Sequence, residues 1–93
     1  MNISPEMIVN RSDNTVYRMV DGEAVIVEPL NGLVNVINEI GSQIWELIDG
    51  KRSAGKIAEI ITSEYEVSSQ IAMDDTLQFL AEMSEKKLVK IEH

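Results

Sequence analysis

The spacing of apolar residues changes character at about residue 38. Before that point, apolar and polar residues tend to alternate in short runs, a pattern typical of strands at residues 16–20, 23–28 and 33–37. The dipeptide Asp21-Gly22 separates the first two runs and is a strong signal for a two-residue hairpin. Residues 29–32, Pro-Leu-Asn-Gly, predict a second turn. The chain therefore predicts a three-stranded antiparallel meander over residues 16–37.

After residue 38 the apolar residues follow the period of an α-helix. Asn38 can begin a helix because its side-chain carbonyl can accept a hydrogen bond from an unpaired amide of the first turn. The apolar positions of this predicted helix, residues 39–49, lie on one face: Ile40, Ile44, Leu47 and Ile48. Gly50 can take the left-handed conformation that ends it. Gly41 weakens the helix by roughly 1 kcal/mol relative to alanine, so packing must hold it.

Two more helices and a short extended tail complete the pattern. Ser53 can cap a helix over residues 54–65, and Ser68 or Ser69 can cap one over residues 70–87. Residues 88–91 read as a β-like tail. Residues 1–15 are interpreted as a partly ordered N-terminal arm, in which residues 7–9 could add a short strand. The prediction is one α+β domain, residues 1–93, with the sheet at 16–37 and a winged helix-turn-helix-like bundle with its tail at 38–93.

Composition and charge narrow the classes of function. The chain has 93 residues, 44% of them hydrophobic, and no cysteine, so disulfides and thiolate metal sites are excluded. It shows neither a signal sequence nor an apolar run of membrane-spanning length, which predicts a cytoplasmic protein with no membrane partner. The net charge is −8, from 16 acids and 8 bases, which opposes binding to nucleic acid.

Candidate catalytic residues are few. The only histidine is the terminal His93, so no Ser-His-acid set can be assembled, and neither a metal-ligand spacing nor a phosphate-binding glycine loop is present. Asp74 and Asp75 are adjacent, and neighbours on a helix do not face each other. Trp45, Tyr17 and Tyr65 are expected to be packing residues. The sequence thus predicts a protein that is not an enzyme and needs no cofactor.

The ordered series of motifs resembles the PqqD family, small domains also called RiPP recognition elements. The resemblance covers residues 16–91 and rests on Gly32 to Asn38, Ile44-Trp45-Glu46-Leu47, Asp49-Gly50, Ser53, Ile57-Ala58, Tyr65, the run from Asp75 to Met83, and Leu88-Val89. Two positions depart from the family pattern. Lys87 stands where the family often has glycine, and Ile40-Gly41-Ser42 replaces a more alanine-rich run.

The resemblance implies a non-catalytic adaptor in the biosynthesis of PQQ or a related peptide natural product. Such domains bind the leader segment of a ribosomally made precursor peptide and deliver it to a modifying enzyme, often a radical S-adenosylmethionine protein. The leader typically adds as a strand beside the third strand, in a groove shared with the third helix. The pathway and the peptide are left undetermined by the sequence.

Candidate binding residues follow from that mode of binding. The third strand has neither proline nor lysine to block pairing; its residues are Leu33, Val34, Asn35, Val36 and Ile37. On the third helix, one flank carries Met73, Leu77 and Ser84, and the other carries Asp75, Glu82 and Lys86. We expect Met73 and Leu77 to form an apolar wall of the groove. Asp75 is expected to pair with a basic leader residue.

Two alternatives remain open at this point. The order of the helices is also that of a winged-helix DNA-binding regulator, although the third predicted helix sums to −2 from four acids and two lysines. A self-associating module is the other alternative, because an open third strand can pair with its own copy in a homodimer.

Overall fold

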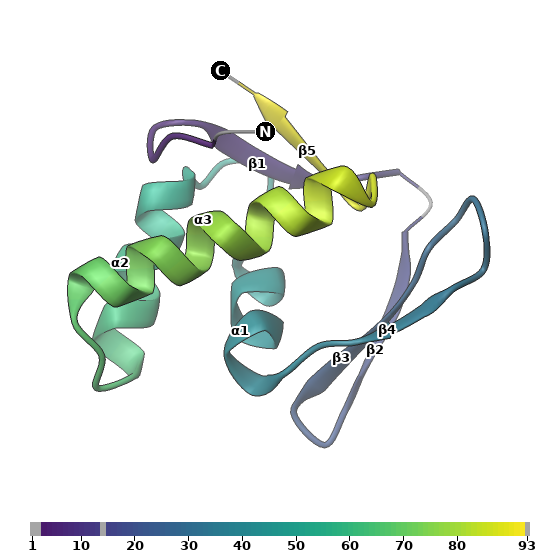
Figure 1. Ribbon diagram of the computed structural model, residues 1–93, viewed down its shortest axis with the longest axis horizontal. Helices are drawn as coiled ribbons and strands as arrows, with labels where there is room; N and C mark the ends of the chain where they lie inside the picture. Colours follow the sequence, from purple (N-terminus) through teal and green to yellow (C-terminus); the bar gives the residue numbers. More distant parts are fainter. Residues whose placement is uncertain (1–2, 14, 93) are drawn as a thin grey trace.

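The computed structural model describes residues 3–13 and 15–92, and Figure 1 shows their arrangement. The prediction for His93 lies outside these residues. The elements run in the order β1 (Ile8–Arg11), β2 (Val16–Val20), β3 (Glu23–Val27), β4 (Val34–Val36), α1 (Glu39–Leu47), α2 (Ala54–Glu64), α3 (Ser69–Glu85) and β5 (Val89–Glu92). The predicted α+β fold, a three-stranded antiparallel sheet followed by three helices, is confirmed.

The meander has the strand order β2-β3-β4, and each neighbouring pair is antiparallel. Both residues of the first turn have positive φ, 51° at Asp21 and 83° at Gly22, as a type I′ hairpin requires. The pairs Val20↔Glu23 and Val25↔Val36 give the register. The three strands lie to one side of α1 and α2 lies to the other, while α3 runs from α2 across α1 toward β5 (Figure 1).

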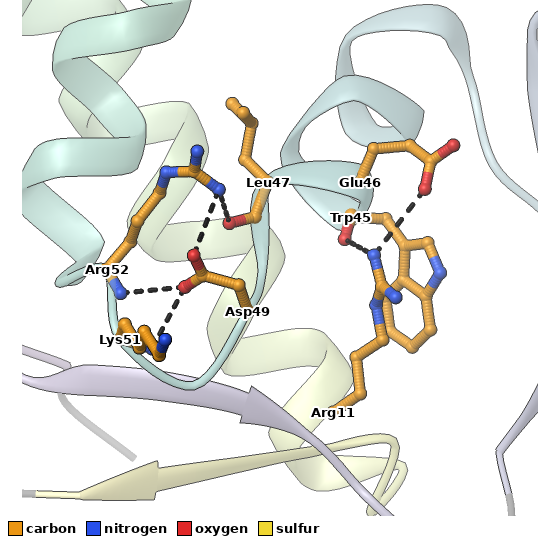
Figure 2. A network of polar contacts seen from close by, with 7 residues as sticks. All are labelled: Arg11, Trp45, Glu46, Leu47, Asp49, Lys51 and Arg52. Atoms are coloured by element: carbon orange, nitrogen blue, oxygen red, sulfur yellow. Dashed lines mark hydrogen bonds and ion pairs between the residues drawn. The ribbon is translucent and has the colours of Figure 1, made fainter.

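Side-chain caps begin all three helices where the sequence predicted. Asn38 accepts from the amide of Gly41, Ser53 from that of Lys56, and Ser68, rather than Ser69, from that of Ile71. Two arginines then hold the end of α1, which stops at Leu47. Arg11 Nη2 donates to the Trp45 carbonyl at 2.8 Å and Arg52 Nη1 to the Leu47 carbonyl at 3.0 Å, as Figure 2 shows. These cations offset the partial negative charge at the helix terminus.

The two ends of the chain form a second sheet. β1 pairs antiparallel with β5, from Ile8↔Glu92 to Arg11↔Val89. The sequence suggested only a possible short strand at residues 7–9 and gave the C-terminal tail no partner. Because this tail pairs with the N-terminal strand, the likeness to a winged helix-turn-helix is loose.

Arg11 also joins this second sheet to the meander. Its guanidinium carbon lies 4.9 Å from the ring centroid of Tyr17 and 5.3 Å from that of Trp45. The two rings meet edge to face at 5.5 Å, and Tyr17 Oη donates to Glu46 Oε2 at 3.0 Å. Burial raises the pKa of the Tyr17 phenol, and the Glu46 hydrogen bond raises it further. Trp45 is fully buried, as expected of a packing residue.

A buried hydroxyl links the meander to α1. The Ile37 amide donates to the Ala24 carbonyl at 2.9 Å, but the Ala24 amide donates to Ser42 Oγ at 2.7 Å. Ser42 Oγ in turn donates to the Ile37 carbonyl at 3.1 Å. The hydroxyl is therefore inserted into the strand ladder at the residue where β4 gives way to the helix. The Ala24 amide and the Ser42 hydroxyl therefore both have hydrogen-bond partners, although Ser42 is fully buried.

Gly41, the predicted weak point of α1, permits a close approach. A Cβ atom built there would lie 2.6 Å from Ile37 Cγ2 and 3.1 Å from Phe79 Cε1. Such distances are below normal packing contact. The missing side chain thus lets Phe79 of α3 pack against the first turn of α1, which offsets the loss in helix propensity.

The end of α3 explains the departure at Lys87. The Leu88 amide donates to the Met83 carbonyl at 2.9 Å and the Lys87 amide to the Ser84 carbonyl at 3.0 Å, the pattern of a Schellman motif. Lys87 has φ 61°, the left-handed conformation that glycine adopts without cost. A lysine here keeps the motif at a cost of about 1 kcal/mol.

Replacing Ser42 with alanine should lower the free energy of unfolding by about 1–3 kcal/mol, because the buried Ala24 amide loses its acceptor. Urea unfolding measures this. Ser63→Ala is the matched control, since that exposed hydroxyl only donates to the Ile60 carbonyl of its own helix. The control should stay within about 0.5 kcal/mol of the parent. Equal effects of the two changes would contradict the role given to Ser42.

Gly41→Ala should lower the free energy of unfolding by about 1–2 kcal/mol, even though alanine favours helix more than glycine does. The added methyl group meets Ile37 and displaces the Phe79 ring. The same unfolding experiment checks this, and a gain of about 1 kcal/mol would show that helix propensity alone governs the position.

Lys87→Gly should raise the free energy of unfolding by about 1 kcal/mol, because glycine adopts the left-handed conformation without strain. Lys86→Gly is the control, since Lys86 has φ −83° and gains nothing from glycine. Stabilisation by both changes, or by neither, would argue against strain at Lys87.

Candidate functional site

The outer edge of the meander is formed by β4. In the described part of the chain, β4 pairs only with β3, and no other strand lies against its far side. The edge carries neither proline nor lysine, the residues that commonly block pairing. This confirms that the third strand of the meander is open on one side.

Only alternate residues of β4 present their backbone to that open side. Hydrogen-bonded and non-hydrogen-bonded pairs alternate along an antiparallel ladder. The Glu28 amide donates to the Leu33 carbonyl at 2.8 Å and the Ile37 amide to the Ala24 carbonyl at 2.9 Å. By this alternation Leu33, Asn35 and Ile37 face β3. The amides and carbonyls of Val34 and Val36 therefore point away from the sheet.

The side chains of β4 divide between two surfaces. Val34 and Val36 are 59% and 65% exposed, on the face of the sheet that also carries Val16 and Val20. Asn35 and Ile37 are half-buried on the opposite face, where Asn35 Oδ1 accepts from Nζ of Lys86, the C-cap residue of α3, at 2.5 Å. A strand added beside β4 would thus present alternate side chains to the valines and to α3.

Two adjoining hollows lie between α3 and the segment that joins β4 to α1. One, of about 290 Å³, is lined by residues from both helices and the junction: Asn38, Ile40, Gly41, Ile44, Asp75, Gln78, Phe79 and Glu82. The other, of about 270 Å³, reaches the strand: Asn35, Val36, Ile37, Asn38, Phe79, Glu82, Met83 and Lys86. Because Asn38, Phe79 and Glu82 line both, the hollows form one groove beside the open edge, called here the β4–α3 groove.

Polar contacts fix one end of the groove. Glu28 accepts from the Asn35 side-chain amide at 2.7 Å and from that of Asn31 at 3.3 Å. The Asn35 hydrogen bond holds the pKa of Glu28 below its usual value, and Asn31 and the charge of Lys86 contribute in the same direction. Asn35 thus joins Glu28, the residue after β3, to Lys86, the C-cap residue of α3. At the other end, Asp75 and Glu82 are exposed on the groove side.

The structure places the predicted residues of α3 in three different surroundings. Asp75 lines the groove, on the flank that also carries Glu82 and Lys86. Met73 does not: it lines a hollow against α2, with Ala58 and Thr62 among its neighbours. Leu77 is half-buried against the core, one helical turn after Met73 on the same flank. Met73 and Leu77, the expected apolar wall, therefore lie on the flank of α3 that faces away from the β4–α3 groove.

Ser84 lines neither of the two hollows that form the groove. It lines a hollow near the β3–β4 turn and the second sheet, together with residues such as Pro29 and Lys90. The difference from the expectation arises because the helical period of α3 defines two flanks without indicating which one meets β4. α2 occupies the Met73 flank, so the groove opens on the other.

Phe79 is the main groove residue that the sequence did not single out. An apolar residue at this position is typical of a helix core face, and Phe79 is half-buried against the core. Yet its ring also lines both hollows. The signal was available in Gly41, whose missing side chain in the facing helix makes room for that ring.

The groove offers backbone pairing and side-chain contacts. Among residues 3–13 and 15–92, no group of three or more His, Cys, Asp or Glu side chains is placed to hold a metal ion. In the same residues, no helix is long and apolar enough to cross a membrane. An open strand beside a groove fits an extended peptide segment, which pairs through its backbone and inserts alternate side chains.

Comparison with solved structures gives the same fold. The chain is similar to TbiB1 in complex with the TbiA(beta) leader peptide, with 27% identity over 87% of this chain and 94% of that chain and a TM-score of 0.79. It also matches lasso peptide synthetase B1 complexed with the leader peptide, at 20% identity over 91% and 98% of the two chains, with a TM-score of 0.75.

A third similar structure is the PqqD truncation of Methylobacterium extorquens PqqCD, described as a functional and stand-alone RiPP recognition element. It shares 19% identity over 95% of this chain and 94% of that chain, with a TM-score of 0.79. No curated protein sequence matches the chain. The model of the family described as coenzyme PQQ synthesis protein D matches residues 23–89, and the chain therefore belongs to the PqqD family.

Proposed function

We propose that this chain binds the leader segment of a ribosomally synthesised precursor peptide by strand addition to β4, and presents it to a modifying enzyme. The observation that carries the proposal is the outward-facing backbone of Val34 and Val36 beside the β4–α3 groove. TbiB1, the solved relative at 27% identity, was determined with a leader peptide, which supports this mode of binding.

Strand addition assigns separate tasks to backbone and side chains. The backbone groups of Val34 and Val36 give two register positions that any extended peptide can use. Selection among peptides falls to the groove, where Phe79 offers an apolar surface and Asp75 a charge. Of the predicted strand residues, Leu33, Asn35 and Ile37 act by holding β4 against β3. The revised set on α3 and its C-cap is Asp75, Gln78, Phe79, Glu82 and Lys86.

The chain would act without chemistry of its own and without a cofactor, leaving the reaction to its partner enzyme. A radical S-adenosylmethionine protein is one candidate for that partner. We propose that the protein acts in the cytoplasm. A second copy of the chain is a competitor for the same site, because pairing two β4 edges in a homodimer would hide it.

DNA binding is not favoured by the surface of α3. Its exposed charges are mainly acidic, with Asp74, Asp75, Glu82 and Glu85. Lys86 and Lys87 follow at its end, and Lys86 is already in contact with Asn35. Carboxylates along a helix oppose its approach to phosphates, from which most protein–DNA affinity comes.

Val36→Pro should weaken leader binding about ten-fold or more while the fold is kept. Proline removes the outward amide of Val36 and places its ring toward the incoming strand, but breaks no hydrogen bond to β3. The probes are the leader segments of the short precursor peptides encoded beside the gene. Calorimetry measures the affinity of each variant for them.

Met19→Pro is the matched control. By the same alternation, Met19 points its amide outward at the opposite edge of the sheet, on β2. Affinity should survive in this variant. Equal loss in both variants, or no loss in Val36→Pro with unfolding unchanged, would remove β4 as the site.

A further inference from the structure

The β4–α3 groove continues into a third hollow. Lys86, which lines the groove beside β4, also lines the hollow of about 460 Å³ near the β3–β4 turn. That hollow is bordered by Leu30, which is 83% exposed, and by Lys87 and Lys90. A path therefore runs along α3 from Asp75 to the lysines that follow the helix, and is longer than β4 itself.

The two ends of this path have opposite charge. Asp75 lies at one end, in a hollow that has no positively charged side chain among its lining residues. Glu82 lines this hollow as well, and it also lines the adjoining hollow that Lys86 reaches. Lys86, Lys87 and Lys90 lie at the other end, and they are three of the chain's 8 bases, in a protein of net charge −8. Asp13 pairs with Lys90 at 3.1 Å, but both side chains are largely exposed, so the pair is weak.

The direction of a bound strand follows from the arrangement of the elements. Asn35 contacts Lys86, and Asn38 shares a hollow with Asp75, so β4 and α3 run in opposite directions. All strand pairs in this sheet are antiparallel. A peptide that continues this pattern runs antiparallel to β4 and hence in the same direction as α3, with its N-terminal side at Asp75.

We propose that the path selects leader segments by the order of their charges: a Lys or Arg on the N-terminal side and an Asp or Glu farther toward the C-terminus. The cation meets Asp75 and Glu82, and the carboxylate meets the lysines at the end of α3. This inference rests on the proposed function and specifies its ligand.

The spacing of the two charges follows from geometry. Eleven helical positions separate Asp75 from Lys86, which corresponds to about 16 Å along the axis of α3. An extended strand covers that distance in about five residues. Because only every second side chain of a strand faces α3, the cation and the carboxylate are expected about four or about six positions apart, with an apolar residue between them on the same face, toward Phe79.

A random library of displayed peptides tests this without a known ligand. Each peptide has about twelve residues, which in extended conformation are long enough to span the path. Selection on the parent protein should enrich sequences with the stated order of charges. Backbone amide shifts of Val34 and Val36 should show that enriched peptides bind at β4.

Charge reversal at adjacent residues supplies matched variants. Asp75→Lys should weaken the enriched peptides about five-fold to ten-fold at low salt, and less at high salt, because an attractive pair becomes a repulsive one. Asp74→Lys makes the same change in net charge, but Asp74 lies outside the groove and accepts from Gln70. The Asp74→Lys change should alter peptide affinity less than about two-fold, because a charge that is exposed and outside the groove contributes little to binding.

Three results would overturn the proposal. Enriched peptides that change the amide chemical shifts of Val34 and Val36 but show no preferred order of charges would refute this inference and leave the proposed function standing. Equal effects of Asp75→Lys and Asp74→Lys would show that net charge alone matters. If the library yields no binder at β4, the proposed function falls with the inference.

Discussion

The hydroxyl of Ser42 is the contact on which the arrangement of this domain depends. It takes the place of one ladder hydrogen bond, accepting from Ala24 and donating to Ile37. The meander is short, and a three-stranded sheet of this size needs a helix to pack against. By holding α1 at the end of β4, Ser42 sets the position of the sheet relative to the helices. The open side of β4 and the flank of α3 are brought together as a consequence.

The groove depends on a second local compromise, at Gly41. A glycine inside a short helix costs helix propensity, but here it admits the Phe79 ring between α1 and α3. The ring forms part of the core and of the groove at once. Binding surface and core packing therefore share residues, and a peptide in the groove would contact side chains that are already held in place. Such preorganisation lowers the entropy that binding must offset.

Local patterns in the sequence were enough to predict the meander, the helix caps and the open strand. Each depends on neighbours in the chain: Asp21-Gly22 for the hairpin, Asn38, Ser53 and Ser68 for the helix starts. The flank of α3 that faces β4 depends instead on where α2 packs, and no periodicity within α3 encodes that. The position of Met73 and Leu77 on the flank away from β4 has this origin. The pairing of β1 with β5 joins residues about eighty positions apart, beyond the reach of any local signal.

Hydrogen exchange at the five residues from Leu33 to Ile37 tests the central claim most directly, since each amide has a predicted direction. Without peptide, the amides of Asn35 and Ile37 should exchange slowly, because they face β3, whereas those of Val34 and Val36 should exchange fast. A bound leader peptide should slow Val34 and Val36 selectively. If Val34 and Val36 exchange as fast with a saturating concentration of peptide as they do without it, strand addition at β4 is contradicted.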